Sequence, residues 1–168
     1  MYFINRDHPP LAFVAQVGRS SDEEQMEHLR ELMQLAREDL GRGRRYVLVV
    51  DGRYTPPVPA AQRRQLWAAL NENHDLVRAS TVAHIFIIES ALMRGALTAL
   101  RWIGALPREM QVVANFAAAL DTAEAELSTH GCPPIPEQLR GPDGEELAFG
   151  AAHRYAKHAL GDYTSHTG

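Results

Sequence analysis

Tyr46-Val-Leu-Val-Val-Asp51 decides the fold of this chain, because an unbroken run of strand-forming residues ends there in a single carboxylate. Two later runs follow the same pattern: Val82-Ala-His-Ile-Phe-Ile-Ile88 ends at Glu89, and Met110-Gln-Val-Val-Ala114 ends at Asn115. A strand that is apolar on both faces must be covered on both faces, as parallel strands of α/β proteins are. The three runs therefore predict a mostly parallel sheet flanked by helices.

Helix-length amphipathic stretches separate these strands and extend the pattern in both directions. Two short strands, at residues 2–4 and 11–17, precede the first helix, which begins at a capping box formed by Ser21 and Glu24. Further helices are expected from about Ala60, after Ser90 and after Asn115. The predicted order is β-β-α-β-α-β-α-β-α followed by a tail, and each crossover between parallel strands should be right-handed.

Composition excludes several classes of protein. The net charge of −4 offers no basic field for nucleic acid, so no nucleic-acid partner is expected. The single cysteine, Cys132, excludes an internal disulfide or a multi-cysteine metal site, and no cofactor motif or metal site is expected. The first residues form no secretory signal and no apolar stretch is long enough to span a bilayer, so the expected location is cytoplasmic.

The polar residues that end the predicted strands are the first candidates for a binding site. Open parallel sheets bind ligands and partners just beyond the carboxyl ends of their strands. Asp51, Glu89 and Asn115 should therefore gather along one edge of the sheet. For Asp51 two readings stay open: a contact to a ligand or partner, or a carboxylate that caps its own turn.

The order of elements, together with three stretches, resembles the STAS-like family (SpoIIAA-like, the anti-sigma-factor-antagonist fold) of bacterial proteins. The stretches are the strand and proline-rich loop of residues 47–59, Ile88-Glu-Ser-Ala-Leu-Met-Arg-Gly95, and Val112-Val-Ala-Asn-Phe-Ala-Ala-Ala-Leu120. The resemblance covers roughly residues 2 to 127.

This resemblance implies a non-enzymatic regulatory or scaffolding module that docks a protein partner in signalling. Phosphorylated members of the family carry an Asp-Ser-Ser-Gly-like turn after a strand. Here the corresponding turn reads Asp51-Gly-Arg-Tyr-Thr-Pro56, in which Tyr54 and Thr55 are the hydroxyl-bearing residues. Asp51, Tyr54 and Thr55 are therefore expected in the docking surface.

Glu89, Ser90 and Arg94 form the sharpest constellation in the chain. Ser90 should cap a helix, and Arg94 lies one turn into that helix, where a guanidinium can clamp a carboxylate or phosphate. This is the basis of an alternative function, a small-ligand or lipid carrier whose pocket lies between the helix of residues 92–106 and the sheet. The competing interpretation is an ion pair of Arg94 with Glu89 or Asp51 that ties the helix to the sheet.

An enzyme is the least supported reading. It would use Asp51, His84 or Glu89 as a general base, but no nucleophile or metal-ligand spacing accompanies them. His84 lies among apolar neighbours, which is typical of a hydrogen-bonded histidine within a sheet. No catalytic residue is assigned.

Composition changes after residue 127, where proline and glycine become frequent. We predict a STAS-like α/β domain at residues 1–128 and a proline-containing extension at 129–168 with a short helix from Glu145 to Leu160. The apolar positions of that helix pack either on the domain or on a partner; they are Leu147, Ala151, Tyr155 and Ala159. The apolar surroundings of Trp102 place its helix in the interior or at a homodimer interface.

Overall fold

The computed structural model describes residues 1–56, 58–95 and 110–159 of the chain. Its strands are β1 (Tyr2–Asn5), β2 (Leu11–Gln16), β3 (Tyr46–Asp51), β4 (Thr81–Ile87) and β5 (Met110–Val113). Its helices are α1 (Asp22–Gly41), α2 (Ala60–Glu72), α3 (His74–Ser80), α5 (Phe116–Thr129) and α6 (Gly144–Ala159), with a short 3₁₀ helix at Glu137–Arg140. Residues 91–95, after β4, are also helical. The predicted position of Trp102 lies outside the described residues.

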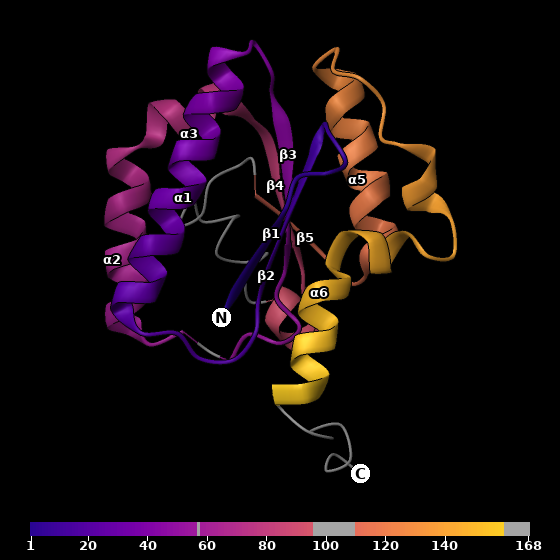
Figure 1. The fold of residues 1–168 in the computed structure, drawn as a ribbon. Helices are drawn as coiled ribbons and strands as arrows, with labels where there is room; N and C mark the ends of the chain where they lie inside the picture. The colour runs from indigo at the N-terminus through magenta and orange to yellow at the C-terminus, as the bar shows by residue number, and fades with distance from the viewer. Residues whose placement is uncertain (57, 96–109, 160–168) are drawn as a thin grey trace.

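The five strands form one sheet in the order β1-β2-β3-β4-β5. β1 is antiparallel to β2, and β2 to β5 are parallel to one another. This confirms an α/β fold with a mostly parallel sheet flanked by helices. Each parallel strand lies beside the one before it, always on the same side. Right-handed crossovers between such strands place all their helices on one face of the sheet. Figure 1 shows α1, α2 and α3 on one face of the sheet and α5 and α6 on the other.

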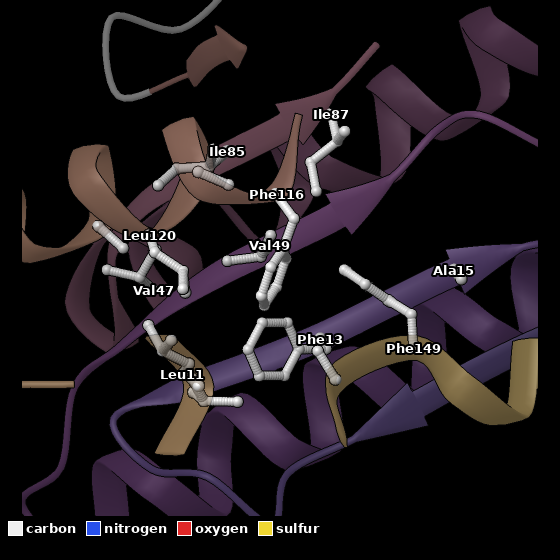
Figure 2. Close-up of a cluster of buried hydrophobic side chains, with 14 of the residues drawn as sticks. Leu11, Phe13, Ala15, Val47, Val49, Ile85, Ile87, Phe116, Leu120 and Phe149 are labelled. Atoms are coloured by element: carbon white, nitrogen blue, oxygen red, sulfur yellow. The ribbon is translucent and has the colours of Figure 1, made fainter. Parts of the chain in front are cut away.

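The second face is therefore covered by helices that follow the last strand. Its core is built around three aromatic rings, Phe13 of β2, Phe116 of α5 and Phe149 of α6, whose centroids lie 5.3 to 6.1 Å apart. Figure 2 shows these rings meeting above Val47 and Val49 of β3, which are 0% exposed. Residues on both sides of position 128 share this core, and those from the extension are Ile135, Leu139, Ala148, Phe149, Ala152 and Ala156.

Burial along β3 is unequal on its two faces. Val47, Val49 and Asp51 face the α5–α6 side and are buried, whereas Leu48 and Val50 on the other face are only half-buried. The helices on that other face form a separate small core centred on Leu29, Met33 and Ala69. The prediction that β3 is buried on both faces is thus met on one face among the described residues.

The helix predicted at the C-terminus is present, but it is turned by about one residue from the expected face. α6 buries Ala148, Phe149, Ala152 and Ala156, whereas the predicted positions Leu147, Ala151, Tyr155 and Ala159 are all exposed. Burying the ring of Phe149 between two other rings stabilises the fold more than burying Leu147 and Tyr155 would, since the hydroxyl of Tyr155 favours contact with water. Of the two predicted alternatives, packing on the domain holds in part for this stripe: the ring of Tyr155 lies 5.5 Å from that of Phe3 in β1, whereas the other three side chains are exposed outside the main core.

The predicted helix signals mostly hold. The hydroxyl of Ser21 accepts from the backbone N–H of Glu24, and the Glu24 carboxylate accepts from the N–H of Ser21, which completes the capping box. The helix predicted from Ala60 onward is instead two helices, α2 and α3. They meet at Asn73, whose side-chain amide donates to the carbonyl of Ala69 at 2.8 Å.

Candidate functional site

Asp51 ends β3 with a carboxylate that is completely buried and bound by the residue two positions later. The Arg53 guanidinium donates from Nε to Oδ1 at 2.9 Å and from Nη2 to Oδ2 at 2.8 Å, and the Arg53 backbone N–H donates to Oδ1 at 3.0 Å. Two parallel N–H···O bonds are the strongest geometry for this pair. Asp51 therefore caps its own turn, the second of the two readings left open by the sequence.

α6 brings two more polar side chains to this pair. His153 Nε2 lies 3.1 Å from Asp51 Oδ2 and 3.1 Å from Arg53 Nη2, and Glu145 Oε1 accepts from Arg53 Nη2 at 2.6 Å. The His153 ring also meets Tyr54 edge-on at a centroid distance of 5.5 Å. We call Asp51, Arg53, Glu145 and His153 the Asp51 cluster. It ties the carboxyl end of β3 to a helix about a hundred residues away in sequence.

The charges of the Asp51 cluster are set by this geometry. Burial alone would raise the pKa of Asp51, but hydrogen bonds from His153 and Arg53, with the charge of Arg53, outweigh burial and hold that pKa at about 2. Burial would lower the pKa of Arg53, but the hydrogen bonds that Arg53 donates to Asp51 outweigh burial, so the pKa of Arg53 is raised. The pair is ionised at any physiological pH. Such a carboxylate is a weak base, and its hydrogen bonds hold the loop after β3 and α6 together.

The two hydroxyl-bearing residues predicted in the same loop hold that loop against β2. Thr55 Oγ1 donates to the carbonyl of Gln16 at 3.1 Å, and the carbonyl of Tyr54 accepts from the N–H of Gly18 at 3.0 Å. Burial raises the pKa of the Tyr54 phenol. Both residues are half-buried, and their bonds anchor the loop after β3 to the end of β2.

Arg94 adopts a role that neither sequence reading anticipated. Its Nη1 donates to the backbone carbonyl of Ile88 at 2.8 Å and also to that of Glu89. Among the described residues Arg94 forms no ion pair with Glu89 or Asp51, so that interpretation is wrong. These two bonds to the carbonyls that follow β4 hold the turn of residues 88–95 in place.

The two predicted capping residues do cap their helices. The hydroxyl of Ser90 accepts from the N–H of Met93 at 3.3 Å, and the Asn115 side-chain oxygen accepts from the N–H of Ala118 at 2.9 Å. Both residues are exposed, as is Glu89. Beside them, Leu92 is 83% exposed and Met93 47% exposed.

The loops after β3, β4 and β5 lie at one edge, as predicted. The N–H of Gly52 donates to the carbonyl of Ile87 at 3.0 Å, and the N–H of Ile88 donates to the carbonyl of Val113 at 2.9 Å. A side chain at Gly52 would come within 3.2 Å of the Ile87 carbonyl oxygen, so the close approach of these two loops favours glycine. The predicted residues therefore share an edge, but each mainly stabilises its own loop.

Sequence reasoning missed Arg53, Glu145 and His153. The position of Arg53 two residues after a strand-ending aspartate was an available signal for a capped turn. No local signal connects His153 to Asp51, because the contact depends on how α6 packs. The histidine proposed as a base, His84, lies half-buried within β4.

The predicted carrier pocket involves residues 96–106, which lie outside the described residues. Elsewhere, a shallow groove of about 500 Å³ lies between α1 and α2. Its walls contain none of the predicted site residues and none of the Asp51 cluster; they are formed by Asp22, Glu23, Met26, Arg30, Gln65, Ala68, Ala69 and Glu72. This groove provides no site for a head group at Arg94.

No protein-family model, curated protein or solved structure matches this chain. Within the described ranges, no helix has both the length and the apolar character needed to cross a membrane. What the molecule displays is a five-stranded α/β domain whose carboxyl edge carries firmly anchored loops.

Proposed function

We propose that this chain is a non-enzymatic, STAS-like regulatory module that docks a protein partner through the loops after β3, β4 and β5. The observation that carries the proposal is the exposure of Leu92, 83%, on the turn that follows β4. Exposed large apolar side chains that cluster in a loop are typical of interaction sites. Met93 adds a second exposed apolar side chain, and Glu89 adds an acidic group beside them.

The rigidity of this turn supports docking. Arg94 binds the carbonyls of Ile88 and Glu89, and Ser90 caps the helix that starts there. A loop already held in its bound shape loses less conformational freedom when a partner binds, which increases affinity. The turn of residues 88–95 thus presents Leu92 as a preformed anchor, with Glu89 at its rim.

The chemistry of the neighbouring loops is better suited to holding shape than to catalysis. The carboxylate of Asp51 is buried, accepts two hydrogen bonds from the Arg53 guanidinium and has a pKa of about 2, so it is a poor proton acceptor. The Thr55 hydroxyl is bonded to the Gln16 carbonyl, and the Asn115 amide oxygen to the N–H of Ala118. The partner expected from the exposed groups has an apolar pocket for Leu92 and a basic side chain for Glu89.

The element order supports the STAS-like assignment. Two strands in a hairpin, followed by alternating helices and parallel strands, form the pattern on which the resemblance rests. Docking at the carboxyl edge of such a sheet follows the general rule for open parallel sheets.

Substitution of the anchor tests the proposal. Leu92→Asp is expected to deplete a discrete set of co-purifying proteins at least about tenfold when the tagged chain is isolated from its own cells, because a charge cannot enter an apolar pocket. Leu40→Asp is the matched control, since Leu40 is 41% exposed near the end of α1 and outside these loops. Circular dichroism checks that both variants are folded. Equal recovery of the same proteins by wild type and Leu92→Asp would overturn the proposal.

A further inference from the structure

The exposed side of α6 carries an apolar stripe that lies outside the main core of the domain. Leu147 is 42% exposed and Tyr155 37% exposed, and Ala151 and Ala159 are exposed with them. These residues recur every fourth position, which places them along one side of the helix. The buried residues of α6 lie about one residue, or roughly 100°, further round the helix, so the helix is apolar on two neighbouring sides and only one of them belongs to the core.

The stripe continues onto the edge strand β1. The rings of Phe3 and Tyr155 lie 5.5 Å apart, and the Asn5 side-chain amide donates to the carbonyls of Leu147 and Ala148 at 2.7 and 3.1 Å. β1 pairs with β2 on one side, and no described strand pairs with its other side. Figure 1 shows α6 beside β1 at the front of the molecule. Strand edge and helix stripe therefore form one continuous surface.

The residues of this surface are arranged symmetrically along α6. Leu147 and Tyr155 lie four residues before and after Ala151. Glu146 and Arg154 lie four residues before and after Gly150, and they form an ion pair across that glycine. The acidic group is thus toward the start of the helix, the basic group toward its end, and two small residues lie between them.

We propose that this surface is the interface of a symmetric homodimer in which α6 packs antiparallel against α6 of a second copy. A two-fold axis near Ala151 brings Leu147 toward Tyr155 of the partner subunit, and the same axis repeats that contact in reverse. It also brings Glu146 toward Arg154 of the partner subunit, so the two internal ion pairs of the separate chains are exchanged for two pairs between the chains. The small side chains at positions 150 and 151 let the two helices approach closely.

Charge complementarity selects a second copy over an unrelated partner. In the first turn of α6 Glu146 is exposed, whereas Glu145 is already bound to Arg53, and the last turn contains Lys157 and His158. An antiparallel pair of such helices places acidic ends beside basic ends at both termini, whereas a parallel pair places like charges together. The surface is made of residues of α6 and β1 and includes none of residues 88–95, so separate substitutions test the dimer and the proposed docking function.

Sedimentation equilibrium of the purified full chain at micromolar concentrations tests the dimer. The wild-type chain is expected to dimerise, and Leu147→Glu and Tyr155→Glu should each raise the dissociation constant at least about tenfold. Leu40→Glu is the control, because Leu40 has nearly the same exposure as Leu147 but lies on α1. Its dissociation constant should match that of the wild type.

Charge reversal distinguishes this dimer from nonspecific association. Glu146→Arg and Arg154→Glu should each weaken it, and the double variant should restore it, because each chain then offers the reversed complement to the other. Thermal unfolding checks that every variant is folded, which is expected for exposed positions. A wild-type chain that remains monomeric overturns the proposal, as does a dimer that Leu147→Glu and Tyr155→Glu leave unchanged.

Discussion

A chain that ends at residue 128 is expected to lose its cooperative unfolding transition. The strand order places α1, α2 and α3 on one face of the sheet, so of the described helices only α5 would remain on the other. Truncation removes Phe149, Leu139 and Ile135 from the core, all of them at most 7% exposed. Each contributes about 1.5 to 3 kcal/mol of burial, against a total stability of about 5 to 15 kcal/mol for an ordinary domain. Scanning calorimetry should show no heat-absorption peak.

One residue within the extension allows a finer version of this test. Phe149→Ala should lower the free energy of unfolding by about 3 to 5 kcal/mol, because it leaves a cavity between Phe13 and Phe116. Leu40→Ala, at an exposed position of α1, should change stability by less than about 0.5 kcal/mol. A sharp transition in the truncated chain, together with similar effects of the two substitutions, would show that the core ends before residue 129.

Loss of the Arg53 guanidinium is the second substitution with a large expected effect. Arg53→Met should destabilise the fold by about 3 kcal/mol, because it leaves the fully buried Asp51 carboxylate without its bidentate partner. Arg140→Met removes the ion pairs to Asp121 and Glu124, which are more exposed, and should alter stability by less than about 1 kcal/mol. Urea denaturation at neutral pH measures both.

Acid provides a control for the cause of this effect. The pKa of Asp51 is about 2 in the folded chain, below its ordinary value of 3.8. Its ionisation therefore stabilises the fold fully above about pH 4, and that contribution is lost as the pH falls toward 2. The stability difference between wild type and Arg53→Met should narrow over this range. A difference that stays constant between pH 5 and pH 3 would mean that Arg53 acts through packing and not through the charge of Asp51.

Much of the fold could be predicted because its signals are local. The strand predicted at residues 46–50 is present and runs one residue further, to Asp51. Ser21 and Asn115 begin helices by capping bonds that follow from their own side chains. The break at Asn73 was missed because the apolar spacing of α2 continues into α3. Strand order was not predictable, since no local pattern encodes which strands are neighbours.

The candidate site was predicted in position but less well in the contacts of its residues. The carboxyl ends of parallel strands meet at one edge whatever their side chains do, so Asp51, Glu89 and Asn115 were placed correctly. One contact of Asp51 is made by His153, which reaches it because Phe149 buries the adjacent turn of α6 in the core. This contact requires α6 to pack with one particular rotation about its axis. Sequence periodicity cannot fix that rotation, and it placed the packing face of α6 about one residue from the face that is buried.

Site-specific photo-crosslinking from position 93 tests the docking function most directly. Met93 is 47% exposed on the turn of residues 88–95, and Leu40 at 41% exposed is a matched position on α1. A photoreactive residue at position 93 should yield a discrete adduct with one partner protein in the cells that make this chain. The adduct should weaken when Arg94→Ala releases the turn, and it should be absent from position 40. Equal labelling from both positions, or no protein adduct from position 93, would contradict docking through this turn.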